Sequence, residues 1–182
     1  NKELPKISVV LSFYNESAVI PELLRRLRQV FAKLMEEKSV GSYELVFVND
    51  NSTDQSEAML RAEIDKGDVV IVNMSRNFGV SECVFAGMEH ATGDAVVYMD
   101  ADLQDPPEVI IDMVRTWRSD AETEVVYTTR LKREQAVKKV VAVASEIPQM
   151  TVLGIAGPGD ALANPKKTFD TFRMLQEQAP DI

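Results

Sequence analysis

The sequence predicts one α/β domain, built on a doubly wound, mainly parallel sheet of about six strands with helices on both faces. Short apolar runs alternate along the chain with segments of helical period, which is the pattern of repeated βα units. The runs are almost continuously apolar, as expected of strands that are buried on both faces. A chain of 182 residues, 45% of them hydrophobic, is long enough for one good core and short for two.

Six apolar runs are the strand candidates, and four segments between or after them carry an apolar helical stripe. Strands are expected at 7–13, 43–49, 69–74, 95–99, 125–129 and 151–155. The stripes consist of Leu23, Leu27, Val30, Phe31 and Leu34; of Ile110, Met113, Val114 and Trp117; of Val137, Val140, Val141, Ala144 and Ile147; and of Phe169, Phe172 and Leu175. Helix starts are indicated by Ser52 with Gln55, which has capping-box spacing, and by Asp105 before Pro106.

Composition argues against several classes of function. The chain has 29 acidic and 20 basic residues, a net charge of −9, which argues against a nucleic-acid or anionic-membrane surface. An anionic substrate would therefore need a metal. The single cysteine, Cys83, rules out a disulfide framework and is interpreted as a buried small hydrophobe. No apolar run approaches the roughly 18 to 20 residues that span a membrane, and no signal peptide opens the sequence, so we expect a soluble, cytoplasmic protein without membrane insertion.

Polar stretches follow four of the expected strands at the point where each ends. They are "SFYNES", "NDNSTD", "SRNFG" and "DADLQDPP". Ligands of open α/β sheets bind beyond the carboxyl ends of the strands, so these stretches are expected to line one crevice. Asp100 and Asp102 are two residues apart, which in extended backbone points both carboxylates the same way. Such a pair favours Mg²⁺ or Mn²⁺ together with a substrate diphosphate. The alternative is that these aspartates form turns and cap helices.

Asp50 and Arg76 each have two interpretations. Asp50 can accept hydrogen bonds from a base or ribose, or it can cap the helix that follows. Arg76 can pair with a phosphate, or it can be a solvated arginine beside the turn residue Gly79. Taken one at a time, these residues favour the structural interpretation, whereas the four stretches together are more specific than any one of them.

Residues 5–132 resemble the nucleotide-binding part of family 2 glycosyltransferases. The motifs that carry the resemblance are "VVLSFYNES", "YELVFVNDNSTDQS", "VNMSRNFGVSECVFAGMEHATGDAVVYMDADLQDPPEVI" and "VVYTTR". They are most similar to the polyprenyl-phosphate branch, with dolichol-phosphate mannose synthase and the bacterial glucosyltransferase GtrB. The resemblance implies a GT-A, Rossmann-like fold that binds a nucleotide-diphosphate sugar of the UDP-glucose type. It also implies transfer of the sugar, with inversion, to a polyprenyl phosphate.

The resemblance also implies roles for individual residues. Tyr14, Asn15 and Glu16 would line the nucleotide end of the site, Asp50 would meet the base, and Arg76 would lie near the sugar nucleotide. Asp100 and Asp102 would form the metal-binding D-x-D motif for Mg²⁺ or Mn²⁺, and Gln104 would lie near the donor sugar. Asp100, Asp102 and Gln104 are thus the expected catalytic residues.

Residues 133–182 resemble a different family. They are similar to a helix–strand–helix segment of the radical-SAM barrel of the nitrogenase cofactor protein NifB. The similarity rests on "GIAGPGD" and its surroundings. The iron–sulfur cluster of that family needs three cysteines, so no such cluster is expected here. Residues 1–132 carry the whole net charge of −9, whereas residues 133–182 are balanced. We therefore expect a single domain, 1–182, that is a chimera of a glycosyltransferase part and a TIM-barrel-derived βα unit.

Two functions stay open at this point. The first is a donor-binding domain that lacks its acceptor half and does not transfer sugar. The second is an engineered α/β scaffold with no catalytic activity, since a joint inside the repeating pattern, without a linker, favours deliberate recombination. Metal-dependent affinity for a nucleotide separates the two.

Overall fold

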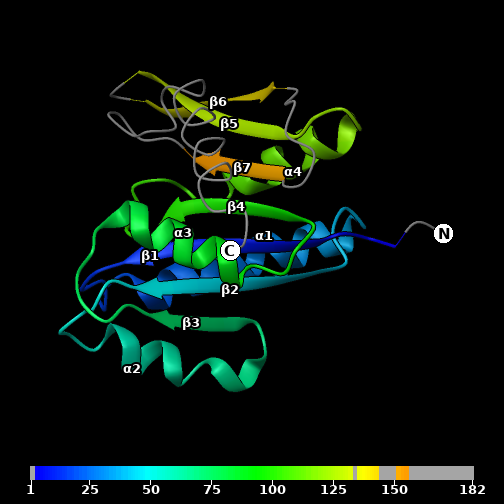
Figure 1. Ribbon diagram of the computed structural model, residues 1–182. Helices are drawn as coiled ribbons and strands as arrows, with labels where there is room; N and C mark the ends of the chain where they lie inside the picture. Colours follow the sequence, from blue (N-terminus) through cyan, green and yellow to red (C-terminus); the bar gives the residue numbers. More distant parts are fainter. Residues whose placement is uncertain (1–2, 133–134, 144–150, 156–182) are drawn as a thin grey trace, which may run out of the picture.

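The fold is that of a computed structural model, which describes residues 3–132, 135–143 and 151–155 (Figure 1). These residues form a seven-stranded sheet with the strand order β3-β2-β1-β4-β7-β5-β6. The strands are β1 Lys6–Phe13, β2 Ser42–Asn49, β3 Val69–Asn73, β4 Ala95–Asp100, β5 Val125–Lys132, β6 Gln135–Val143 and β7 Thr151–Ile155. Every pairing is parallel except that of β6, which runs antiparallel to β5.

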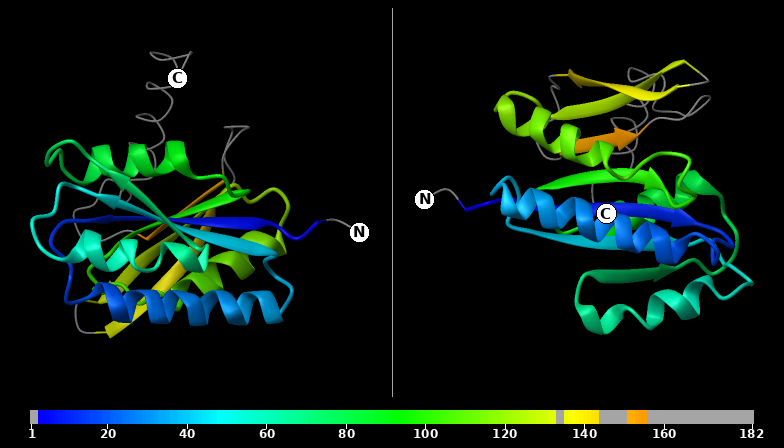
Figure 2. Two further views of the ribbon diagram at one scale, coloured as in Figure 1. Left: turned by 90° about the horizontal axis from the view of Figure 1, so that it is seen from below. Right: turned by 180° about the vertical axis from the view of Figure 1, so that it is seen from behind.

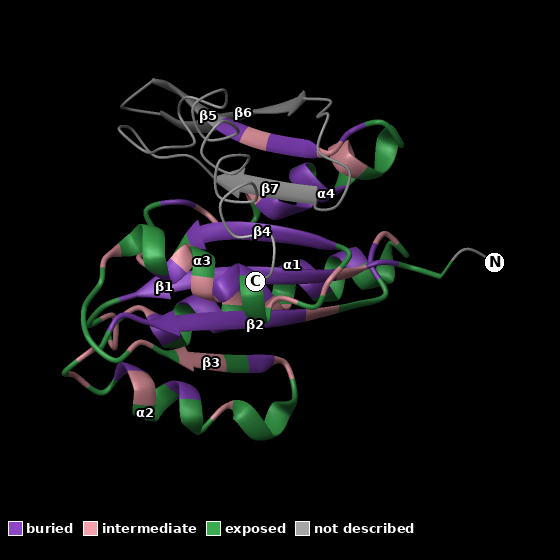
Figure 3. Cartoon of the chain, viewed as in Figure 1, coloured by how far each residue is buried: buried purple, intermediate pink, exposed green. Residues whose placement is uncertain are grey.

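Helices cover both faces of the sheet, as the sequence predicts (Figure 2). They are α1 Ile20–Glu36, α2 Ser56–Arg61, α3 Val80–His90 and α4 Val109–Ser119, with a 3₁₀ turn, η1, at Ile64–Lys66. Helices α1, α2 and α4 pack on one face, where the predicted stripes of α1 and α4 join the larger apolar core. Helix α3 packs on the other face against Val10, Val46 and Val48. The central strands are accordingly buried on both sides (Figure 3).

Helix α3 lies unusually close to the sheet because of Gly87. A Cβ atom at that position would lie 2.3 Å from Cγ1 of Val10 and 3.0 Å from Cγ2 of Val48. Only glycine fits such an approach without displacement of the strand side chains. The first turn of α3 is thereby held over the carboxyl ends of β1 and β2.

The strand order also fixes where a ligand can bind. β1 lies between β2 and β4, so the chain leaves the sheet in opposite directions on the two sides of the β1–β4 pair. In doubly wound sheets the crevice outside the carboxyl ends of the strands at this switch point is the usual ligand site.

Several expectations about individual elements are wrong. The six expected strands coincide with β1 to β5 and β7 to within three residues at each end. The expected number of strands is wrong, because the segment around Val137–Val141, which was expected to be helical, forms the additional strand β6. Val140 and Val141 there pair with Thr128 and Tyr127 of β5. A short run rich in valine fits both periods, and β-branched residues favour the strand. The helix expected around Phe169, Phe172 and Leu175 lies outside the described residues.

Both predicted helix caps also differ from the structure. Helix α2 begins at Ser56 with Gln55 as its N-cap, so Ser52 is not a cap. Helix α4 begins at Val109, with Glu108 rather than Asp105 before it. Among the described residues, no helix has the length and apolarity needed to cross a membrane.

Candidate functional site

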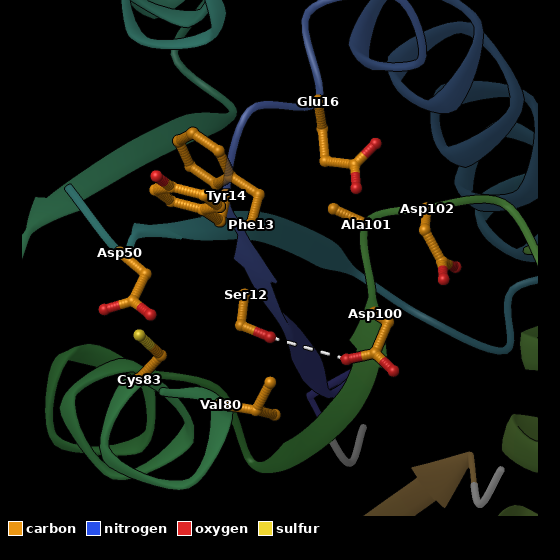
Figure 4. A pocket seen from close by; sticks show the side chains of 10 residues that line it. All are labelled: Ser12, Phe13, Tyr14, Glu16, Asp50, Val80, Cys83, Asp100, Ala101 and Asp102. Carbon is orange, nitrogen blue, oxygen red and sulfur yellow. Dashed lines mark hydrogen bonds between the residues drawn. The ribbon is translucent and has the colours of Figure 1, made fainter. Parts of the chain in front are cut away.

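A pocket of about 250 Å³ opens at the switch point, between the carboxyl ends of β1, β2 and β4 and the first turn of α3 (Figure 4). It is lined by Ser12, Phe13, Tyr14, Glu16, Asp50, Val80, Cys83, Asp100, Ala101 and Asp102. Five of the residues expected from the sequence are among them, namely Tyr14, Glu16, Asp50, Asp100 and Asp102. Asn15, Arg76 and Gln104 do not line it.

Asp100 is the last residue of β4 and shares the α3-side face of that strand with Tyr98. The phenol of Tyr98 donates a hydrogen bond of 2.7 Å to Oδ1 of Asp100. Ser12, the partner of Asp100 in the β1–β4 register, donates a longer one of 3.5 Å to the same oxygen. Ser12 and Tyr98 are not among the site residues predicted from the sequence. Their signal is a polar atom inside an apolar strand, on the same face as a strand-end carboxylate.

Asp102 lies in a turn rather than in extended backbone. Because β4 ends at Asp100, the expectation that both carboxylates project from one extended segment is wrong. Leu103 has a positive φ of 59°, and the amide of Gln104 donates to Oδ1 of Asp102 at 2.9 Å. The turn nevertheless keeps Asp102 at the pocket, whereas the Gln104 side chain is exposed to solvent.

Asp50 is 6% exposed and binds the loop that leads into α3. Its Oδ1 accepts from the amide of Phe78 at 2.7 Å, and its Oδ2 accepts from the amide of Gly79 at 2.9 Å. Gly79 is the N-cap of α3 and has φ of 101°, a conformation that glycine adopts without strain. Asp50 therefore has a structural role. Its carboxylate binds the backbone at the start of α3, and not that of α2, the helix that follows it in sequence.

Cys83 of α3 is fully buried beside Asp50, as expected of a small hydrophobe. Burial, reinforced by the negative charge of Asp50, raises the pKa of the Cys83 thiol to about 12. The thiol therefore stays protonated at neutral pH and contributes to the pocket wall as a neutral group.

Arg76 and Asn15 have other neighbours. The guanidinium carbon of Arg76 lies 4.4 Å from the centre of the Phe78 ring, and both side chains are exposed. The side-chain oxygen of Asn15 accepts from the amide of Thr53 at 2.8 Å, in the loop after β2. Neither side chain reaches the pocket lining in this conformation.

The pocket is strongly acidic. Glu16, Asp50, Asp100 and Asp102 contribute carboxylates, and none of the described residues that line it is lysine, arginine or histidine. Burial raises the pKa of Glu16, and the charges of Asp102 and Asp54 raise it further. An anionic ligand alone would be repelled here, so a cation must accompany it.

The donor set fits a hard divalent cation that is shared with a ligand. Asp100 and Asp102 offer carboxylate oxygens, which Mg²⁺ and Mn²⁺ prefer. The described part of the chain contains no group of three or more histidine, cysteine, aspartate or glutamate side chains that could hold a metal by themselves. Mg²⁺ is typically bound by one or two carboxylates together with substrate phosphates. A diphosphate ligand would therefore complete the site.

Comparison with known proteins identifies the family. The model of glycosyl transferase family 2 matches residues 8–163. The chain belongs to this family. It is 41% identical over 182 residues to the uncharacterized glycosyltransferase YkcC of Bacillus subtilis, an alignment that covers 96% of this chain and 54% of that protein.

Other relatives of this family 2 chain are named for polyprenyl-phosphate chemistry. It is 40% identical over 134 residues to undecaprenyl-phosphate 4-deoxy-4-formamido-L-arabinose transferase of Klebsiella pneumoniae, which covers 72% of this chain and 39% of that protein. It is 37% identical over 138 residues to the prophage bactoprenol glucosyl transferase homolog of Escherichia coli, which covers 72% and 44%. The chain thus spans about half or less of the length of these relatives.

Solved structures place the chain among glycosyltransferase folds. The mannosyltransferase PcManGT of Pyrobaculum calidifontis, in complex with GDP-Man and Mn²⁺, matches with a TM-score of 0.57 and 26% identity, over 71% of this chain and 37% of that chain. The S. aureus protein TarS in complex with UDP matches in fold, with a TM-score of 0.54 and 23% identity, over 74% of this chain and 38% of that chain. The expected GT-A class of fold agrees with these neighbours.

The comparisons give no support to a chimera or to a radical-SAM segment. The family match continues to residue 163, and the Bacillus relative aligns over 96% of the chain, so both pass the joint expected near residue 133. The resemblance to a radical-SAM segment rested on "GIAGPGD", and short glycine-rich motifs of this kind occur in many unrelated proteins. Residues 156–160 of the motif lie outside the described residues.

Proposed function

We propose that this chain binds a nucleotide-diphosphate sugar together with Mg²⁺ or Mn²⁺, and that it forms the donor-binding part of a transferase that moves the sugar to a polyprenyl phosphate. The observation that carries the proposal is the convergence of Asp100, Asp102 and Asp50 on one acidic pocket at the switch point of a family 2 chain. Relatives named for undecaprenyl-phosphate and bactoprenol transfer support the acceptor class. A structural neighbour in complex with GDP-Man and Mn²⁺ supports the donor and the metal.

Asp100 and Asp102 are the residues that would hold the cation. Tyr98 and Ser12 orient Asp100 from the sheet, and the Gln104 amide orients Asp102 from the turn. The bound cation would supply charge neutralisation to the diphosphate as it leaves the sugar. These hydrogen bonds hold the two carboxylates in place, because Tyr98 and Ser12 stand on adjacent strands of the sheet and the Gln104 amide belongs to the backbone of the turn.

Tyr14 and Asp50 provide the nucleotide end of the pocket. The Tyr14 ring is 48% exposed at the mouth of the pocket and offers a flat face to a base. Each oxygen of Asp50 accepts one backbone amide, and a carboxylate has about four acceptor positions. Asp50 can therefore hold the loop before α3 and still accept a hydrogen bond from a base or ribose. Arg76 near the diphosphate and Gln104 near the sugar belong to the same proposal.

The acceptor needs no strong base from the protein. A phosphate monoester has a second pKa of about 6, so at neutral pH it is already a nucleophile that can attack the sugar from the face opposite the leaving diphosphate. This agrees with a pocket in which no described lining residue is histidine. We assign none of the described residues to the acceptor.

Calorimetric titration tests the donor proposal. UDP-glucose, the expected donor, and GDP-mannose are titrated into the protein with Mn²⁺ and again after addition of EDTA. Saturable binding of one of them that EDTA abolishes is the expected result. Absence of binding for both, from a protein that melts cooperatively, would refute the proposal. We also expect no sugar transfer by this chain alone, and a lipid product from UDP-glucose and polyprenyl phosphate would contradict that expectation.

A further inference from the structure

Three consecutive backbone amides of the loop between β1 and α1 donate to three side chains at the start of α2 and in the loop before it. The pairs are the amide of Asn15 with Oγ of Ser52 at 3.0 Å, that of Glu16 with Oγ of Ser56 at 2.9 Å, and that of Ser17 with Oδ2 of Asp54 at 3.1 Å. We call Ser52, Asp54 and Ser56 the clasp. Each member binds a different residue of the neighbouring loop, so the contact fixes the path of the loop and not one point on it.

The loop that the clasp holds turns sharply at Asn15. Asn15 has φ of 58°, in the left-handed region, which asparagine adopts more readily than most residues that carry a Cβ atom. In the opposite direction, the side-chain oxygen of Asn15 accepts hydrogen bonds from the amides of Thr53 at 2.8 Å and Asp54 at 3.3 Å. The two loops therefore bind one another in both directions.

Asp54 is the charged member of the clasp, and its carboxylate links the start of α2 to the loop before α1. Oδ1 accepts from the amide of Ser56 at 2.9 Å, while Oδ2 accepts from the amide of Ser17. Burial opposes ionisation of Asp54, but hydrogen bonds from Ser56 and Ser17 outweigh it and hold the pKa of the carboxyl well below its usual range. Asp54 is therefore a carboxylate at neutral pH.

The residues that the clasp positions are those of the pocket wall. Tyr14 and Glu16, on either side of Asn15, both line the pocket, whereas Ser52, Asp54 and Ser56 do not. We propose that Asp54, with Ser52 and Ser56, is a positioning residue for donor binding, which holds Tyr14 and Glu16 in the pocket without touching the ligand. The part that concerns the donor rests on the function proposed above.

Hydrogen exchange tests the clasp without any ligand. In Asp54→Asn one side-chain acceptor becomes an NH₂ group that faces a backbone N–H, so one of the two bonds must break. We expect exchange of the amides of residues 15–17 to rise at least about tenfold, while exchange in β1 and β2 stays unchanged. Asp65→Asn is the matched control, since it removes the same charge from an exposed residue of η1. Unchanged exchange at residues 15–17 in Asp54→Asn would overturn the proposal.

The effect of the clasp on donor binding is tested by titration, with a pair of Ser52 variants that remove or keep the hydroxyl. Ser52→Ala removes the oxygen that accepts from Asn15, whereas Ser52→Thr keeps it. In titrations of UDP-glucose with Mn²⁺, Asp54→Asn and Ser52→Ala are expected to bind at least about fivefold more weakly, and Ser52→Thr and Asp65→Asn as wild type does. Should Asp54→Asn fail to fold, the Ser52 pair decides. Equal losses in Ser52→Ala and Ser52→Thr, or none in Ser52→Ala, would overturn the positioning role. A wild-type protein that binds neither UDP-glucose nor GDP-mannose refutes the proposed function instead, and exchange alone then decides whether the clasp holds the loop.

Discussion

The phenol of Tyr98 donates a hydrogen bond of 2.7 Å to Oδ1 of Asp100, two residues further along β4. Tyr98 is 4% exposed and packs under α3, while Asp100 emerges from the strand end into solvent. A donor on a rigid strand thus orients the carboxylate proposed as a metal ligand. A hydrogen bond to an ionised acceptor is short and strong, and this one is independent of any loop.

Tyr98→Phe is expected to weaken metal-dependent binding of UDP-glucose by about tenfold. The ring still fills its place in the core, but Asp100 loses the donor that fixes its rotamer, and a hydrogen bond to a charged group contributes on the order of 1.5 kcal/mol. Titration with Mn²⁺ measures the change. Tyr127→Phe, which removes the same oxygen from β5 outside the pocket, should bind as wild type does. Equal behaviour of the two variants would contradict the role of Tyr98.

Asp102→Asn is expected to abolish metal-dependent nucleotide binding and to leave the fold intact. The asparagine oxygen can still accept from the Gln104 amide, so the turn is retained, but the charge that attracts the cation is gone. The control is Asp120→Asn, because Oδ1 of Asp120 accepts from the amide of Glu122 at 3.0 Å in a similar turn away from the pocket. Thermal melting should be nearly unchanged in both variants. Unchanged nucleotide affinity in Asp102→Asn would remove Asp102 from the metal site.

Glu16→Gln is expected to stabilise the metal-free protein at neutral pH. Burial and the charges of Asp102 and Asp54 raise the pKa of Glu16 from 4.5, so the folded state binds this proton more tightly than the unfolded state does. The cost of ionising Glu16 therefore appears as the pH rises above about 4.5 and is complete above the raised pKa. In EDTA, melting should be higher for Glu16→Gln than for wild type at about pH 7.5 and equal at about pH 4. A variant less stable than wild type at pH 7.5 would contradict this.

Cys83 is expected to react very slowly with thiol reagents in the folded protein. Its pKa of about 12 leaves almost no thiolate at pH 8, and the side chain is fully buried. Labelling with a chromogenic disulfide should be at least about a hundredfold slower in buffer than in denaturing urea. A native rate equal to that of the unfolded chain would contradict the burial of Cys83 between α3 and the sheet.

Much of the fold could be predicted from the sequence because strands buried on both faces leave a strong signal. The runs that became β1, β2 and β4 are almost wholly apolar, and the stripe of α1 has a clear helical period. β6 could not be predicted in the same way. Val137, Val140 and Val141 satisfy both periods, and only the pairing of β6 with β5, a tertiary contact, decides between them.

The part of the site that lies at the ends of strands could be predicted from the sequence. Strand ends identified Asp50, Asp100 and Asp102, since parallel topology alone brings them to one edge of the sheet. The family resemblance placed Asn15 at the nucleotide, and capping-box spacing placed Ser52 at a helix start, whereas in the structure each binds the other's loop. Hydrogen bonds between loops distant in sequence leave no periodic pattern of residues. The clasp therefore could not be predicted from the sequence.

The most direct test of the account is to locate Mn²⁺ by paramagnetic broadening of backbone amide signals. With UDP added, Mn²⁺ is expected to broaden the signals of residues 12–16, 79–83 and 100–104 first, and Mg²⁺ with UDP should shift the same signals without broadening them. This result would place the metal nucleotide in the pocket between β1 and β4. Broadening that begins at exposed acidic residues elsewhere, such as Glu22 or Asp112, with the pocket signals unaffected, would contradict it.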